Sequence, residues 1–205
     1  YVPEELHCSL PLDAATIDFV EEVYLHGLGE FAYTNQLDLR GRIRIKAPPQ
    51  SSKPAPVGLS GRGALVPVGG GKDSIVTIET LKKTGTDMAL FALSGISGPA
   101  RPIADTIRVS GLPSCIVTRT ISADLIRLNQ TGVYNGHVPI TAILSVIALC
   151  AAILQGLKSV IMSNEFSASA PNVTQDGLEI NHQYSKSFAF EQQLASYVRT
   201  HVSPD

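Results

Sequence analysis

Residues 64–74 read Ala64-Leu65-Val66-Pro67-Val68-Gly69-Gly70-Gly71-Lys72-Asp73-Ser74, an apolar run that leads into three glycines, a lysine and two polar residues. The apolar run predicts a buried strand, although Pro67 cannot donate a hydrogen bond to a neighbouring strand. The residues from Lys72 onward predict a helix. Glycines between a strand and a helix let the backbone approach a ligand, and their N–H groups join the helix N-terminus in an anion site. We therefore predict a phosphate-binding loop over residues 69–74.

The side chains of this loop add to the backbone site. Lys72 supplies a mobile positive charge, while Asp73 and Ser74 can cap the helix or reach a Mg²⁺–phosphate unit. A Walker A loop needs Ser or Thr directly after Gly-Lys, but Asp73 intervenes here. A dinucleotide fingerprint would need glycine at position 74, where the chain has Ser74. A glycine-rich turn that binds no ligand is the remaining alternative.

Strand and helix signals alternate from residue 64 to the end of the chain. Strands are expected at 64–68, 87–93, 114–118 and 159–162, and helices at 72–83, 101–110, 122–128, 138–155 and 187–198. The first of these helices is expected to turn Ile75, Ile78 and Leu81 inward. Such alternation predicts an α/β fold, in which helices flank both faces of a parallel sheet. Ligands bind such sheets at the carboxyl ends of the strands.

The residues before this pattern divide into two parts. Residues 1–46 are expected to form a small N-terminal helical segment, in which Asp13 caps a helix that stops at Gly27. Residues 47–63 are rich in Pro, Ser and Gly, which predicts a flexible loop that could close over a ligand as a lid. The nucleotide-binding domain is then expected to cover residues 64–205.

Composition argues against several classes of function. Hydrophobic residues make up 44% of the 205 and the formal net charge is −2, so we expect a folded core and no nucleic-acid partner. Three separated cysteines without a CxxC pair favour a reducing compartment, and we expect a cytoplasmic protein. Residues 138–157 carry no charge and are long enough to span a membrane. Pro139, Gly156 and the strand signal that follows favour instead a buried helix that is apolar all round, without a membrane partner.

The six residues Gly69-Gly70-Gly71-Lys72-Asp73-Ser74 resemble the SGGKDS signature of PP-loop ATP pyrophosphatases, with glycine in place of the first serine. The resemblance implies an adenine nucleotide alpha hydrolase-like fold that cleaves ATP to AMP and pyrophosphate and adenylates a carboxylate or amide oxygen. Nucleotide contacts are then expected from residues 69–74 and from Ser94, which follows the second expected strand. Asp73 and Glu165 are the expected Mg²⁺ ligands, because a carboxylate beside a triphosphate acts mainly through Mg²⁺.

A narrower resemblance extends along most of the chain. After a helix pair that includes Tyr24–Phe31, the chain carries in order Val66–Ser74, Asn135-Gly136-His137-Val138-Pro139, Ser163-Asn164-Glu165-Phe166-Ser167-Ala168-Ser169 and Asn181-His182-Gln183-Tyr184-Ser185-Lys186-Ser187. Together these stretches resemble the UDP-N-acetylmuramoyl-L-alanyl-L-glutamate epimerases of bacterial peptidoglycan synthesis. The resemblance implies that ATP and Mg²⁺ serve to epimerise the terminal L-glutamate of this small molecule to D-glutamate, through an adenylated carboxylate.

Inversion at a glutamyl Cα requires a base on one face and an acid on the other. The candidates are His137, His182, Lys186 and Tyr184. His137 precedes the expected apolar helix, and its alternative role is to cap that helix. The other three lie within five residues of one another, and the alternative for them is a polar surface run. Weaker candidates for contacts to phosphate or to the muramoyl peptide are Arg119, Asp124 and Arg127.

Two other functions remain open. An ATP-dependent synthetase that forms an amide or nitrile from a different carboxylate would use the same glycine loop. A non-enzymatic module could instead sense an adenine nucleotide. Glu165 and the 182–186 cluster would be superfluous in a sensor, which favours an enzyme. The sequence does not fix the oligomeric state.

Overall fold

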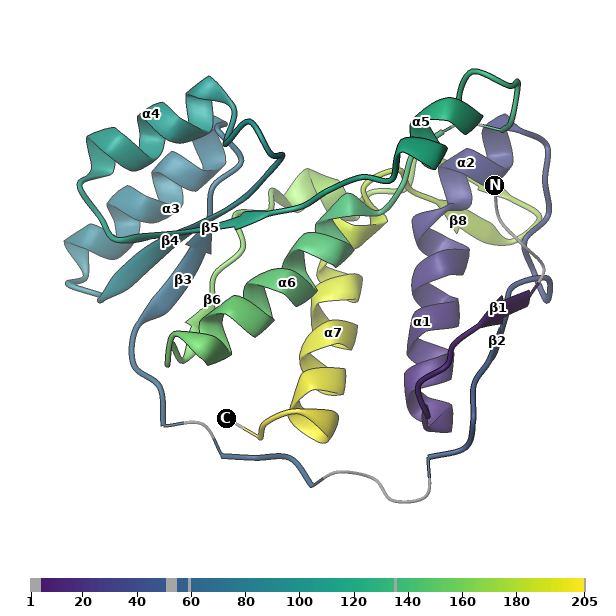
Figure 1. Ribbon diagram of the computed structural model, residues 1–205, viewed down its shortest axis with the longest axis horizontal. Coiled ribbons are helices and arrows are strands. Elements are labelled where there is room, and N and C mark those ends of the chain that lie inside the picture. The colour runs from purple at the N-terminus through teal and green to yellow at the C-terminus, as the bar shows by residue number, and fades with distance from the viewer. Residues whose placement is uncertain (1–4, 51–54, 59, 135, 205) are drawn as a thin grey trace. The chain divides into compact units, whose positions relative to one another are not determined.

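The computed structural model describes residues 5–50, 55–58, 60–134 and 136–204 (Figure 1). The chain forms two compact units that are interleaved along the sequence. The first unit comprises Tyr1–Val57, Ala123–Ala142 and Phe166–Pro204, and the second comprises Gly58–Ser122, Ile143–Glu165 and Asp205. The expected division into a helical segment (1–46), a flexible loop (47–63) and a nucleotide-binding domain (64–205) stays a prediction. In the expected loop 47–63, residues 51–54 and 59 lie outside the described residues, and the described ones form neither helix nor strand.

The second unit is built on a four-stranded parallel sheet with the order β5-β4-β3-β6. Its strands are β3 (Ala64–Pro67), β4 (Met88–Ser94), β5 (Ser114–Thr118) and β6 (Ser159–Val160). Pro67, which cannot donate a hydrogen bond, is the last residue of β3 and lies in register with Phe91. All four strands run in one direction, so their carboxyl ends meet at the same edge of the sheet.

Helices cover both faces of this sheet, as Figure 1 shows: α3 (Lys72–Lys83) and α4 (Arg101–Ser110) lie on one face and α6 (Ile140–Leu154) on the other. Successive residues of a strand point to opposite faces. Accordingly, Val66 and Leu90 pack in a core cluster with Ile78 of α3, while Leu65 and Phe91 pack in a second cluster with Ala148 of α6. The predicted α/β fold with a parallel sheet flanked by helices is confirmed.

Two details of the prediction for this unit are wrong. Ile75 is 46% exposed: it lines a cavity of about 280 Å³ with Val109 of α4 and does not belong to the core cluster that holds Ile78. Helix α6 is not buried all round: it packs small residues such as Ala148 against the sheet and leaves Ile143 and Leu154 exposed. Of the helices that the structure describes, none combines the length and apolar character that crossing a membrane requires.

The N-terminal part of the first unit is more than a helical segment. Helix α1 (Ala14–Gly27) begins as expected at Asp13, whose carboxylate accepts a hydrogen bond from the Thr16 N–H group at 2.8 Å. Helix α2 (Gly29–Thr34) follows directly. The strands β1 (Glu5–His7) and β2 (Arg44–Lys46) were not expected, and they pair in parallel.

The C-terminal part of this unit contains a hairpin that the sequence analysis missed. Its strands are β7 (Val173–Gln175) and β8 (Leu178–Ile180), which pair antiparallel. The two residues between them, Asp176 and Gly177, have φ values of 50° and 78°. Two left-handed residues in a two-residue turn match the right-handed twist of a hairpin. The remaining elements are α5 (Ala123–Leu128), α7 (Phe188–His201) and the 3₁₀ turns Phe166–Ser169 and Tyr184–Lys186.

Candidate functional site

The glycine-rich loop lies at the carboxyl edge of the sheet of the second unit, between β3 and α3. Gly70 has a φ of +79°, and a Cβ atom there would lie 3.0 Å from Cβ of Pro102 and 3.2 Å from Cγ1 of Ile103. Only glycine meets both conditions without strain. Gly71 is the N-cap of the twelve-residue helix α3 and provides no side chain to cap it. The first N–H groups of α3 therefore stay free of a capping side chain, as an anion site requires.

The other residues of the loop divide into structural and accessible ones. Ser74 is 5% exposed, and its hydroxyl donates to the Gly71 carbonyl at 3.0 Å, which fixes the first turn of α3. Lys72 is exposed and Asp73 is half-buried. A Cβ atom at Gly69 would meet nothing within 4 Å, so space is open beside the loop. Ser74 thus shapes the loop, while Lys72 is free to reach a ligand.

Other predicted residues come to the same edge because the strands are parallel. Ser94 ends β4, is 5% exposed and donates its hydroxyl to the Gly95 carbonyl at 3.1 Å. The Arg119 N–H group, just after β5, donates to the Ser94 carbonyl at 2.9 Å. Ser163, after β6, donates its hydroxyl to the Thr77 hydroxyl of α3 at 2.9 Å. These contacts tie the ends of the strands to one another and to α3.

Glu165, the second expected Mg²⁺ ligand, is exposed in the segment after β6. Within the described part of the chain, no three His, Cys, Asp or Glu side chains are close enough to hold a metal ion. Magnesium beside a triphosphate commonly needs only one or two protein carboxylates, since phosphate oxygens and water supply the other ligands. The arrangement is therefore compatible with Mg²⁺ brought in with a nucleotide.

The first unit contains a cavity of about 610 Å³ that brings two of the predicted catalytic residues together. The rings of His137 and His182 lie edge to face, with their centroids 6.1 Å apart. The cavity is lined by Glu30, Tyr33, Thr34, His137, Asn172, Val173, Ile180 and His182. Histidine is the usual side chain for moving a proton near neutral pH, so two of them at one cavity suit acid–base chemistry.

The position of His137 depends on the glycine before it. A Cβ atom on Gly136 would lie 2.8 Å from Cδ2 and 3.3 Å from Cα of Phe31, a buried residue of α2. Burial lowers the pKa of His137, the Glu30 carboxylate raises it, and the charge of Lys186 and that of His182 when its ring is protonated lower it further. The balance favours the neutral imidazole, the form that accepts a proton.

The ring of His182 is held by Asn172. The side-chain oxygen Oδ1 of Asn172 accepts a hydrogen bond from the backbone N–H of His182 at 2.9 Å. The same oxygen lies 2.7 Å from Nδ1 of the His182 ring. One carboxamide oxygen therefore contacts both the backbone and the ring of this residue.

Tyr184 and Lys186 are placed differently from the two histidines. The Tyr184 hydroxyl donates to Oε1 of Gln193 at 2.8 Å, and its ring stacks on His26. Burial, together with the negative charge of Glu22, raises the pKa of Tyr184 to about 12. Lys186 is exposed and acts on His137 through its charge. Neither residue lines the histidine cavity.

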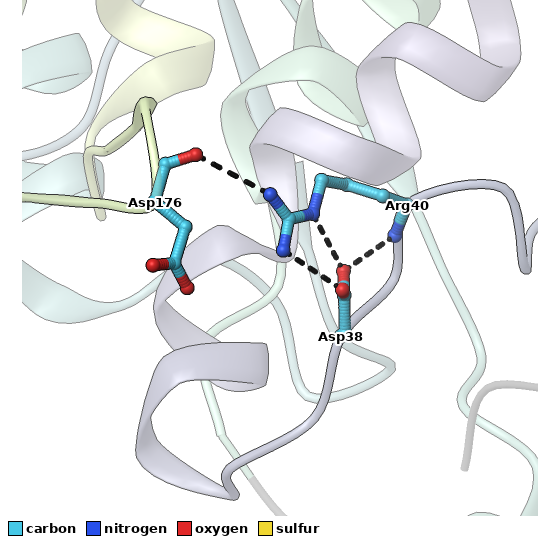
Figure 2. A network of polar contacts seen from close by, with 3 residues as sticks. All are labelled: Asp38, Arg40 and Asp176. Atoms are coloured by element: carbon cyan, nitrogen blue, oxygen red, sulfur yellow. Dashed lines mark hydrogen bonds and ion pairs between the residues drawn. The ribbon is translucent and has the colours of Figure 1, made fainter.

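A second cavity of about 800 Å³ shares Tyr33, Thr34 and Ile180 with the histidine cavity. Arg40 is one of its lining residues. Figure 2 shows Arg40 between the Asp38 carboxylate and the Asp176 backbone. The guanidinium donates to both Asp38 oxygens at 2.9 Å and to the Asp176 carbonyl at 3.3 Å. Hydrogen bonds from Arg40 hold the pKa of Asp38 at about 2. The Asp176 carboxylate points away from Arg40 (Figure 2).

Several cavity residues escaped the sequence analysis. Glu30 lay within the quoted helix pair, but nothing in the pattern separated it from a solvated helix charge. Asn172 reaches His182 only through the hairpin, which had not been recognised.

Of the weaker candidates, Arg127 is paired with Asp124 at 2.8 Å on α5, so each partly neutralises the other.

Comparison with known proteins adds the family. The family model described as "MurL N-terminal domain" matches residues 1–205. Three curated relatives bear the name UDP-N-acetyl-alpha-D-muramoyl-L-alanyl-L-glutamate epimerase. The protein from Xanthomonas oryzae pv. oryzae is 44% identical over 96% of this chain and 43% of its own length. Those from Salinispora tropica and a Micromonospora species are 42% and 40% identical over 98% of this chain and over 43% and 44% of their own lengths.

The chain thus spans less than half the length of these relatives. Among solved structures, NMN synthetase from Francisella tularensis is similar at a TM-score of 0.39 and 13% identity, over 53% of this chain and 48% of that one. A likeness this weak does not establish a shared fold. The match of the family model over all 205 residues does establish the family. The chain belongs to the MurL N-terminal domain family.

Proposed function

We propose that this protein epimerises the terminal L-glutamate of UDP-N-acetylmuramoyl-L-alanyl-L-glutamate to D-glutamate, with ATP and Mg²⁺. The observation that carries the proposal is the cavity at which His137 and His182 meet, in a chain whose relatives are named as epimerases of this substrate. Inversion of a Cα centre needs one group to remove a proton and another to return one. Two neighbouring imidazoles at one cavity supply groups of this kind.

The glycine loop of the second unit is proposed to hold the triphosphate. Free N–H groups at the start of α3, open space at Gly69 and the exposed Lys72 all fit a polyanion. Asp73 in the first turn of α3 would supply a carboxylate for Mg²⁺, and Glu165 is the second proposed ligand. Ser94 would support the loop from the end of β4, since its buried hydroxyl fixes the backbone there.

The bound nucleotide supplies one piece of chemistry: it converts the substrate carboxylate into an ester-like group that can accept the negative charge left when the Cα proton is removed. A free carboxylate cannot do this, because it already carries negative charge. The proton itself is moved by the chain's own side chains. His137, which its surroundings keep in the neutral form, and His182 are proposed as the two groups that move it, one on each face of the Cα. Lys186 would add a positive charge nearby, and Tyr184 would hold the segment through its contacts with His26 and Gln193.

An ATP–pyrophosphate exchange assay on the full-length protein tests the proposal. Exchange should require Mg²⁺ and the muramoyl dipeptide, and Lys72→Ala or Asp73→Ala should abolish it. His182→Gln should keep the exchange but slow proton transfer at the glutamyl Cα by about 10²–10⁴-fold. Exchange with a different carboxylate only would indicate an amide- or nitrile-forming synthetase, and nucleotide binding without any exchange would indicate a sensor. Either result would overturn the proposal.

A further inference from the structure

We infer that Asn172 is a positioning residue, which holds the His182 ring with its proton on Nδ1 and so leaves Nε2 as the atom that takes up the substrate proton. The inference rests on the proposed function, because it names the group that orients one of its two histidines. Asn172 lies outside the four sequence stretches that carry the family resemblance.

The tautomer follows from hydrogen-bond donors and acceptors alone. A backbone N–H can only donate, so the Asn172 atom that meets the His182 N–H at 2.9 Å must be the amide oxygen. The same oxygen lies 2.7 Å from Nδ1 of the ring, which is a hydrogen-bond distance. Because the amide oxygen can only accept, Nδ1 must be the donor of this hydrogen bond. Nδ1 therefore carries the proton. A neutral ring protonated on Nδ1 has its lone pair on Nε2.

The hairpin explains why Asn172 reaches this histidine. The register pairs Val173 with Ile180, and the Asn172 N–H donates to the Ile180 carbonyl at 2.8 Å. Asn172 thus leads into β7 where the chain leaves β8 toward His182. The Asn172 side chain therefore contacts His182, which lies two positions beyond Ile180 and ten residues from Asn172 in the sequence. The Asp176–Gly177 turn sets this register and hence the contact.

The proton transfer uses both ring nitrogens. As the Cα–H bond breaks, its electron pair forms a Cα=C bond, the C=O π pair moves onto the carbonyl oxygen of the activated carboxyl group, and the proton binds Nε2. The resulting imidazolium still donates from Nδ1 to Asn172, so the hydrogen bond is kept throughout. When the C=O bond forms again, Cα takes up a proton from the acid on the opposite face. In the described part of the chain, Nε2 of His182 has no hydrogen-bond or ion-pair partner. The titratable groups that line the same cavity are Glu30, Tyr33 and His137, and Lys186 acts on His137 from nearby.

The size of the effect follows from one solvent-exposed hydrogen bond. The net contribution of such a bond corresponds to about a five-fold preference for one tautomer over the other. Asn172→Ala should therefore shift the neutral His182 ring toward protonation on Nε2 and lower kcat for Cα proton exchange about five-fold, with KM unchanged. Asn172→Asp should keep the proton on Nδ1 and restore the rate. Its carboxylate would stabilise the imidazolium, so the pH of half-maximal exchange should rise by about one unit.

The test combines two measurements on the full-length protein labelled with ¹⁵N-histidine. Long-range ¹⁵N–¹H NMR reports which nitrogen of the neutral His182 ring is protonated, and His182→Gln identifies its signals among the five histidines. Deuterium incorporation at the glutamyl Cα gives kcat, KM and the pH profile. Asn181→Ala is the matched control, because the Asn181 side chain accepts from the Gln183 N–H at 2.7 Å and donates to the Ala168 carbonyl at 2.8 Å, and among the described residues no hydrogen bond joins it to the His182 ring. This control should leave the His182 tautomer unchanged.

The outcomes separate the inference from the proposed function. A wild-type His182 ring protonated on Nε2, or an equal loss of the Nδ1 tautomer in Asn181→Ala, would overturn the inference. So would an unchanged kcat in Asn172→Ala, or an Asn172→Asp profile that does not move. If the wild-type protein shows no Cα exchange at all, the proposed function fails and with it the catalytic role of Asn172. The NMR result still decides the tautomer.

Discussion

Gly70→Ala adds one methyl group where β3 turns into α3, and two separate penalties are expected from it. The φ of +79° places an L-residue in the left-handed region, at a cost of about 1–2 kcal/mol. The new Cβ would lie 3.0 Å from Pro102 and within 3.3 Å of the Ile103 backbone nitrogen, and overpacking of this kind costs about 1–3 kcal/mol. The free energy of unfolding of the second unit should therefore fall by about 2–5 kcal/mol.

Two control variants separate these penalties in urea unfolding. Gly85 has a φ of +68° with nothing within 4 Å of an added Cβ, so Gly85→Ala should cost only the conformational part, about 1–2 kcal/mol. Gly69→Ala has neither a positive φ nor a close neighbour and should change stability least. Because relief of the strain would move the loop, calorimetry should also show weaker ATP binding by Gly70→Ala. Equal costs for Gly70→Ala and Gly85→Ala would refute the close approach of α4 to the loop.

Three further predictions concern the first unit. Gly136→Ala should lower the free energy of unfolding by about 1–3 kcal/mol, since its Cβ would press on Phe31. The control is Gly95→Ala in the second unit, whose Cβ would meet nothing within 4 Å. Similar shifts in thermal unfolding for both variants would contradict the close contact with Phe31. Because folding raises the pKa of Tyr184 from 10.0 to about 12, its contribution to stability is full below about pH 10 and is lost between about pH 10 and 12. Tyr184→Phe should lack that alkaline loss, and an unchanged pH profile would count against the burial of the phenol. Because burial lowers the pKa of His137, its NMR titration midpoint should lie below pH 6.5, and its contribution to stability should be lost as the pH falls. A midpoint at or above pH 6.5 would contradict the burial of this ring.

The fold of the second unit was predictable because its signals are local. The apolar run that ends in glycines correctly predicts β3 and the start of α3. The expected strand at 114–118 has the same bounds as β5. Helix α4 ends at Gly111 with a φ of 68°, as a C-terminal glycine predicts. Ile75 shows the limit of this reasoning. Helical periodicity identifies an apolar stripe, but it does not tell which neighbouring element each residue on the stripe faces.

The candidate site was predicted less completely because it depends on contacts between distant residues. His137 and His182 were identified as reactive types near element ends, but only the fold brings their rings within 6.1 Å. The hairpin that positions Asn172 carried a usable signal. Asp176-Gly177 between two short runs is a strong local indication of a two-residue turn. Its register, and therefore the contact with His182, still depends on pairing that a single sequence does not display.

We propose that the terminal glutamate, once ATP has activated its carboxyl group, loses and regains its Cα proton through histidines of this chain. The most direct measurement is turnover of UDP-N-acetylmuramoyl-L-alanyl-L-glutamate by the full-length protein in D₂O, with mass spectrometry of the glutamyl residue. We expect one deuterium at Cα of the D-glutamyl product, dependent on ATP and Mg²⁺ and strongly reduced in His182→Gln. Product that carries no deuterium, or deuterium that appears equally without ATP, would contradict it.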